Sequence, residues 1–219
     1  MTLKAVFFDL GETLIDETRL WREWANYLGV SERDFIAALE QVIARGEHHH
    51  RAFEVLQPGF DPKAAQRRRA ADGTRYLFHP DDLYPDAKAC LTALRRAGFF
   101  VGIAGNQSRD LLDSMLALSL DVDVITTSEH LGFDKPSPRF FEGLLAQTGF
   151  RAEEAAYVGD RIDNDILPAK AVGMTTVFLK RGPWGRAHAG QSAEADICVE
   201  TLAELPDALE RIKQGAGRG

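Results

Sequence analysis

From Phe99 onward, short apolar runs alternate with helical patterns, and this alternation restricts the possible folds more than any other feature. With one further run near the N-terminus, the apolar runs are Ala5 to Phe8, Phe99 to Ala104, Val122 to Thr126, Ala155 to Val158, Thr175 to Leu179 and Asp196 to Val199. Their length and their Val, Ile and Phe content predict buried strands. Helical patterns run from Asp86 to Ala97 and from Pro138 to a closing Gly149. The chain therefore predicts an α/β fold, a doubly wound parallel sheet with helices on both faces.

The interval from Asp16 to Leu83 differs, because it contains no strand-like run. Its apolar residues recur at helical spacing: Leu20, Trp21, Trp24 and Leu28, then Phe35, Leu39, Val42 and Ile43. Ser31 and Asp34 have the spacing of a capping box. We expect a core of residues 1–15 and 84–219, and a helical domain of residues 16–83 inserted into it.

Composition argues against several kinds of partner. The chain has 219 residues and a net charge of −7, so it has no overall field that attracts nucleic acid or an anionic membrane. Its apolar runs are too short to cross a bilayer. Cys90 and Cys198 stand in apolar contexts, which favours buried thiols over a disulfide or a metal pair. We expect a cytoplasmic monomer or homodimer with no nucleic-acid or membrane partner.

Polar residues gather after four of the predicted elements. The segments are Asp9-Leu10-Gly11-Glu12-Thr13-Leu14, Gly105-Asn106-Gln107-Ser108, Lys135-Pro136 and Gly159-Asp160-Arg161-Ile162-Asp163-Asn164-Asp165. In parallel sheets, ligands bind beyond the carboxyl ends of the strands, where the strand order reverses. We therefore expect several carboxylates around one lysine at that edge.

Such a set suits phosphoryl transfer. A carboxylate nucleophile and a dianionic substrate repel each other unless a divalent cation and a fixed ammonium neutralise them. Mg²⁺ prefers oxygen ligands and keeps several waters, so Asp9, Asp160 and a backbone carbonyl are enough protein ligands. Lys135 would balance the remaining charge. The expected partner is a small phosphorylated substrate.

In their order and separation, the four segments resemble the four motifs of the haloacid dehalogenase-like hydrolase superfamily, over nearly the whole chain. The resemblance implies a Rossmann-like core with a helical C1 cap at residues 16–83, and a phosphoric monoester hydrolase that uses Mg²⁺. It implies that Asp9 forms an aspartyl-phosphate, that Lys135 and Asp160 organise the site, and that Asp165 supports the metal shell.

Two positions depart from the phosphatase pattern, so we expect reduced activity. Gly11 replaces the Asp that protonates the leaving group, although its backbone carbonyl remains available to the metal. Glu12 is the candidate replacement acid, but a neighbouring residue on extended backbone points the other way. Gly105 replaces a Ser or Thr that binds phosphate. Backbone amides nearby, or the side chains of Asn106 or Ser108, are the expected substitutes.

Three other functions stay open beside the phosphatase. One is a non-catalytic phosphate-binding or regulatory protein that has lost its acid/base group. A receiver-like phospho-acceptor domain is disfavoured by a nucleophile on the first strand. A haloacid dehalogenase proper is disfavoured because that branch has an aromatic residue where Gly11 stands.

Two further clusters favour ordinary structural roles. His48, His49 and His50 are expected on a helix, where consecutive side chains diverge and hold no common metal ion. Residues 67–69 are three arginines, which we expect to form a solvated helix face.

Overall fold

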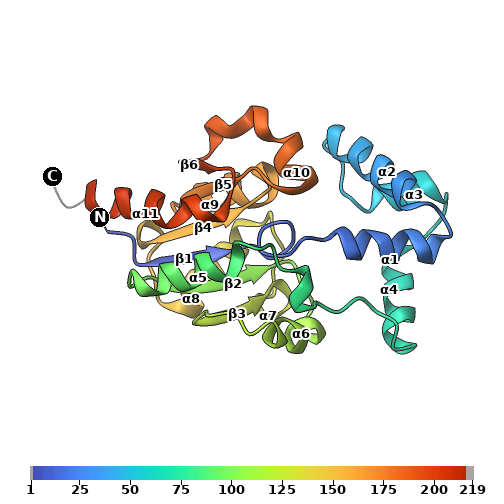
Figure 1. Ribbon diagram of the computed structural model, residues 1–219, viewed down its shortest axis with the longest axis horizontal. Helices are drawn as coiled ribbons and strands as arrows, with labels where there is room; N and C mark the ends of the chain where they lie inside the picture. The colour runs from blue at the N-terminus through green and yellow to red at the C-terminus, as the bar shows by residue number, and fades with distance from the viewer. Residues whose placement is uncertain (1, 216–219) are drawn as a thin grey trace. The chain divides into compact units, whose positions relative to one another are not determined.

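The computed structural model describes residues 2–215, and its six strands form one parallel sheet (Figure 1). Across the sheet the strand order is β3-β2-β1-β4-β5-β6. The strands are β1 (Ala5–Phe8), β2 (Phe100–Gly105), β3 (Val124–Thr127), β4 (Ala155–Gly159), β5 (Thr175–Leu179) and β6 (Ile197–Val199). The predicted α/β class is confirmed, and every strand lies where an apolar run predicted it.

Strand β1 lies at the centre of the sheet, between β2 and β4. The chain adds β2 and β3 on one side of β1, and then returns to place β4 on the other side. Phe8 is level with Ile103 of β2 and with Val158 of β4. The strand order therefore reverses beside β1, and the residues that follow these strands leave the sheet at one edge.

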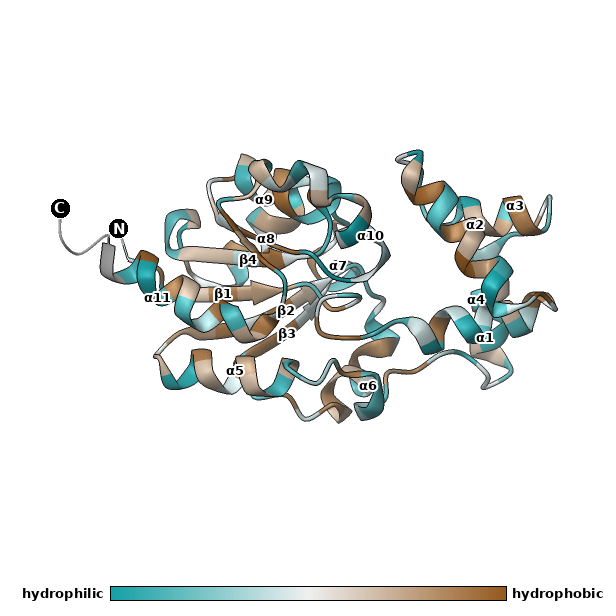
Figure 2. Ribbon diagram, turned by 45° about the horizontal axis from the view of Figure 1, so that its top comes forward, coloured by the Kyte–Doolittle hydropathy of each residue, from teal (hydrophilic) through white to brown (hydrophobic). Residues whose placement is uncertain are grey.

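Helices cover both faces of the sheet, as Figure 2 shows for α5 on one side and α8 with α9 on the other. Helix α5 (Ala87–Arg96) packs beside α11 (Leu205–Gly215), and α8 (Pro138–Thr148) packs beside α9 (Leu167–Ala171). A core cluster under α8 includes Phe7, Phe140, Phe141 and Tyr157, all fully buried. Shorter helices complete this unit: α6 (Leu112–Ala117), α7 (Ser128–Leu131) and α10 (Gly182–Ala187).

Residues 17–77 form a second compact unit, which is entirely helical. Its helices are α1 (Thr18–Leu28), α2 (Glu32–Ala44), α3 (Arg51–Leu56) and α4 (Pro62–Ala71). The Ser31 hydroxyl caps α2 by accepting the Asp34 N–H at 3.1 Å, as the capping-box spacing predicts. The Trp24 and Phe53 rings pack edge to face at the centre, with centroids 4.9 Å apart.

The expected solvated face of three arginines is wrong for Arg69. Its side chain is buried, and its guanidinium binds Glu23 at 2.7 Å and the Thr74 carbonyl at 3.0 Å. It also lies over the Trp24 ring. Arg69 therefore ties α4 to α1 through a partly buried ion pair.

Both cysteines are free, but only one is buried. Cys90 lies in the core face of α5. Cys198 is exposed, so the expectation of a buried thiol is wrong there: β6 is the edge strand, and its thiol donates to the Ser192 carbonyl at 3.1 Å. Among residues 2–215, no helix has both the length and the apolar character that a membrane crossing needs.

Candidate active site

The carboxyl edge of the sheet brings Asp9, Lys135, Asp160 and Asp165 together. Asp9 follows β1, and its N–H donates to the Val158 carbonyl at 2.9 Å. The Lys135 ammonium donates to Asp9 Oδ1 at 2.7 Å and to Asp165 Oδ1 at 2.6 Å. The three aspartates each offer one oxygen, and these oxygens lie within 4.8 Å of one another. Segments more than a hundred residues apart thus form one charged centre.

Lys135 is a buried ammonium whose backbone is held by Asn106. The Asn106 side chain donates to the Lys135 carbonyl at 2.9 Å and accepts the Lys135 N–H at 2.8 Å. Burial lowers the pKa of Lys135, but the carboxylates of Asp165 and Asp9 outweigh it, so the pKa lies well above its ordinary value. The side chain therefore stays charged beside Asp9.

Asp165 accepts a hydrogen bond from the Lys135 ammonium, and Gly159 leaves space for the Asp165 side chain. It belongs to a single π-helical turn, Ile162–Ile166, an irregularity that often marks functional sites. Its Oδ2 accepts the Arg161 N–H at 3.1 Å, so both carboxylate oxygens are engaged. A β-carbon on Gly159 would overlap the Asp165 carboxylate. Gly159 is therefore required by close approach.

Asp160 has the features of a carboxylate that needs a cation. It is 1% exposed, and its Oδ2 has no hydrogen-bond partner among the described residues. Burial raises the pKa of Asp160 well above its ordinary value, and the charges of Asp165, Asp9 and Glu12 raise it further. Unpaired buried carboxylate oxygens are costly, and a divalent cation beside Asp9 and Asp160 would remove that cost. These residues therefore fit Mg²⁺.

Glu12 points away from the direction that extended backbone would give, because its φ is +53°. The side chain is buried, and its Oε2 accepts the Tyr84 hydroxyl at 2.6 Å. A β-carbon on Gly182 would lie 2.5 Å from Glu12 Oε2. The Arg181 guanidinium lies 4.1 Å from the centre of the Tyr84 ring. Sequence reasoning did not assign Tyr84 or Arg181 a role near Glu12.

The end of β2 carries the predicted phosphate-binding residues. Gly105 ends the strand beside Asp9, while the Asn106 side chain is engaged by the Lys135 backbone. Ser108 lies farther on, at the start of the Arg109–Leu111 turn. The structure thus brings Gly105 against Asp9 and gives Asn106 a second task. Gln107 lies between Asn106 and Ser108, and the sequence analysis did not propose a role for it.

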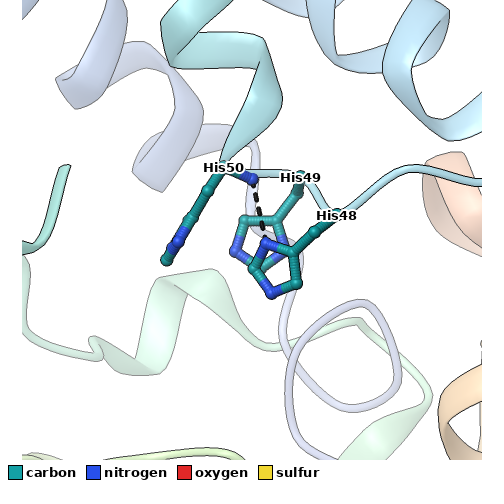
Figure 3. Close-up of side chains that lie close together, drawn as sticks. All are labelled: His48, His49 and His50. Atoms are coloured by element: carbon teal, nitrogen blue, oxygen red, sulfur yellow. Dashed lines mark hydrogen bonds between the residues drawn. The ribbon is translucent and has the colours of Figure 1, made fainter. Parts of the chain in front are cut away.

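The three histidines lie in a turn rather than on a helix, so the expected helix is wrong there (Figure 3). Helix α2 ends at Ala44, and Gly46 with a φ of +68° redirects the chain. The His48 and His49 rings stack at 4.2 Å, and the His50 N–H donates to His48 Nδ1 at 3.2 Å. One nitrogen from each ring lies within 4.8 Å of the others. The turn thus gathers side chains that a helix would separate.

A family model described as haloacid dehalogenase-like hydrolase matches residues 3–173. The chain belongs to this family. One curated relative of this hydrolase is a glyceraldehyde 3-phosphate phosphatase of Methanopyrus kandleri, 30% identical over 231 residues, 96% of this chain and 98% of the relative. Another is a phosphoserine phosphatase of Thermus thermophilus, 33% identical over 171 residues, 73% of this chain and 68% of that protein.

The hydrolase also resembles solved structures of the family in fold. A haloacid dehalogenase-type hydrolase from Bacillus subtilis, solved with bound magnesium, superposes with a TM-score of 0.66 at 19% identity. The match covers 95% of this chain and 99% of that one. At this identity the likeness concerns the fold alone.

Proposed function

We propose that this hydrolase is a Mg²⁺-dependent phosphatase of a small phosphorylated metabolite, with Asp9 as the nucleophile. The observation that carries the proposal is the pair formed by Asp9 and Lys135, 2.7 Å apart at the carboxyl end of the central strand. Relatives that act as phosphatases on glyceraldehyde 3-phosphate and phosphoserine support the same substrate class.

Asp9, Asp160 and the Gly11 carbonyl are the proposed magnesium ligands. Asp160 contributes the oxygen that has no hydrogen-bond partner among the described residues. Asp165 is proposed to support the metal shell indirectly, because both of its oxygens are engaged by Lys135 and the Arg161 N–H. When bound, Mg²⁺ would neutralise charge between the substrate phosphoryl group and the carboxylates.

Asp9 attacks phosphorus, the bond to the leaving oxygen breaks, and an aspartyl-phosphate forms. The Lys135 ammonium offsets the negative charge of Asp9 and of the phosphoryl group in this step. Water then attacks the aspartyl-phosphate, releasing orthophosphate and restoring Asp9. Gly11 has no side chain that could give the leaving oxygen a proton, so the first motif is degenerate at this position. General acid–base catalysis contributes about 10²–10⁴-fold, so alkoxide leaving groups lose most.

The alternative to this mechanism without a general acid is that Glu12 protonates the leaving oxygen, and its position sets a condition on that role. Its Oε2 accepts the Tyr84 hydroxyl, so protonation of the carboxyl would alter this hydrogen bond.

We propose the helical unit of residues 17–77 as the C1 cap that selects the substrate. We also propose that the protein acts as a monomer or homodimer.

The test is Mg²⁺-dependent hydrolysis of aryl, acyl and alkyl phosphates, with the rate plotted against leaving-group pKa. We expect a steep dependence in the wild type and no turnover by Asp9→Asn. If alkyl phosphates also react well and Glu12→Gln steepens the dependence, Glu12 supplies the proton. Binding of phosphate without turnover of any ester would instead identify a non-catalytic phosphate-binding protein. Gly11 supports that alternative, because it removes the usual acid/base side chain.

A further inference from the structure

The Gln107 side chain lies where a side chain at position 105 would begin. A β-carbon on Gly105 would lie 2.5 Å from Gln107 Oε1 and 2.8 Å from Asp9 Oδ1. Gly105 is not among the glycines with positive φ, so its backbone does not require glycine. Any side chain at position 105 would therefore overlap the Gln107 carboxamide and, less severely, the Asp9 carboxylate.

Gln107 reaches this position because the chain folds back sharply after β2. The Gln107 N–H donates to the Gly105 carbonyl at 2.9 Å, which returns the side chain over the strand end. Gln107 Oε1 is buried and has no hydrogen-bond partner among residues 2–215. A buried amide oxygen without a partner is costly unless a ligand or a turn of the carboxamide satisfies it.

The neighbouring amide cannot take this task without releasing Lys135. Both polar atoms of the Asn106 side chain already bond to the Lys135 backbone. The Gln107 carboxamide, at the end of β2 and beside the Gly105–Asp9 contact, is therefore still available to a ligand.

We propose that the Gln107 carboxamide binds the phosphoryl group, in place of a hydroxyl at position 105. A half turn about the Cγ–Cδ bond exchanges Oε1 and Nε2, and an anionic phosphoryl oxygen beside Asp9 favours the orientation in which Nε2 donates. The ligand is a phosphate monoester or inorganic phosphate. The proposal rests on the proposed phosphatase function.

The same geometry makes Gly105 and Gln107 interdependent. A side chain introduced at position 105 must displace Gln107, and it also lies too close to Asp9 Oδ1, which Lys135 holds. Gly105→Ser alone therefore removes one phosphate donor while it adds another. After Gln107→Ala, the serine meets no carboxamide, and its hydroxyl can bind the phosphoryl group once the Asp9 carboxylate shifts slightly.

The experiment is a double-mutant cycle of Gly105→Ser and Gln107→Ala in the full chain with Mg²⁺. It measures kcat and KM for an aryl phosphate and, by calorimetry, the affinity for inorganic phosphate. We expect Gln107→Ala to lower kcat/KM about 10²-fold, as the loss of one preorganised donor does. The double variant should recover about tenfold of that loss, a non-additivity expected of residues that share one space. Gln107→Met, which keeps the side-chain volume, should match Gln107→Ala.

Gln147→Ala is the matched control, because this glutamine is exposed on α8 and bonds only Thr126 among the described contacts. Gln107 variants that keep wild-type turnover and phosphate affinity overturn the inference and leave the phosphatase standing. A wild type that binds phosphate without turnover, and loses that affinity in Gln107→Ala, supports the inference while the phosphatase function fails. A wild type that neither binds nor turns over phosphates overturns both.

Discussion

The Asn106 side chain forms two hydrogen bonds with the Lys135 backbone, donating to its carbonyl at 2.9 Å and accepting its N–H at 2.8 Å. The two bonds fix where the Lys135 side chain starts, and thus where its ammonium meets Asp9. Asn106 therefore acts as a positioning residue for a charge on another segment.

Asn106→Ala should lower kcat about 10- to 100-fold, because small misplacements of a catalytic group have effects of this size. KM should change less, and the steep leaving-group dependence should remain. Steady-state kinetics on an aryl phosphate measure both parameters. Asn26→Ala, on the exposed face of α1, is the control. Wild-type kcat in Asn106→Ala would mean that Lys135 is positioned without this amide.

Gly159→Ala should displace Asp165, because a β-carbon at Gly159 overlaps its carboxylate. We expect a loss of about 1–3 kcal/mol in the free energy of unfolding, typical of overpacking, together with loss of turnover. Gly143→Ala in α8 is the matched control. Its β-carbon would meet nothing closer than 3.7 Å, so it should be neutral or stabilising by up to about 1 kcal/mol. Urea unfolding compares the two, and equal effects would contradict the overlap.

Magnesium should stabilise the wild type against unfolding, by about 2.7 kcal/mol at a concentration one hundred times its Kd. Asp160→Asn should remove this gain, whereas Asp163→Asn, an exposed neighbour paired with Arg161, should keep it. Because burial raises the pKa of Asp160, protons compete with the cation, and the Mg²⁺ affinity should fall as the pH falls. Thermal unfolding with and without Mg²⁺ at several pH values tests both points. An Asp160→Asn protein that Mg²⁺ still stabilises would place the cation elsewhere.

The helical unit should lose stability in mild acid through His50. Burial, followed by the charges of His48 and Lys63, lowers the pKa of His50 from 6.5 to about 4. Between pH 6.5 and about pH 4, His50 is protonated in the unfolded chain but neutral in the folded chain. The free energy of unfolding therefore falls as the pH falls through this range. Allowing for the partial exposure of the ring, we expect a loss on the order of 1 kcal/mol between pH 7.5 and 5.

His50→Gln should lessen this loss, and His130→Gln, exposed on α7, should not. Chemical unfolding followed by tryptophan fluorescence at the two pH values provides the comparison. The same pH dependence in His50→Gln and the wild type would assign the proton uptake to another group.

The strands and the charged centre could be predicted from the sequence because both depend on local patterns. Apolar runs located all six strands, and the segments that follow them contained Asp9, Lys135, Asp160 and Asp165. These carboxylates and the lysine meet because parallel strands end at one edge, a property of the topology rather than of any particular contact.

The contacts around that centre could not be predicted in the same way. The direction of Glu12 depends on a positive φ that only the surrounding structure sets, and its partner Tyr84 lies far along the chain. Gln107 fills the space on Gly105 through a sharp turn that no periodicity reveals. The histidine turn and the burial of Arg69 likewise depend on where helices end and pack.

The single ammonium of Lys135 pairs with two carboxylates, Asp9 and Asp165, so the centre has an excess of negative charge before any ligand arrives. A phosphate dianion approaching that centre is repelled, whereas a divalent cation is attracted. The two ligands should therefore add in a compulsory order, cation first. Because substrate would then add only to the cation-bound protein, mass action predicts that the apparent KM for the cation falls as the substrate concentration rises.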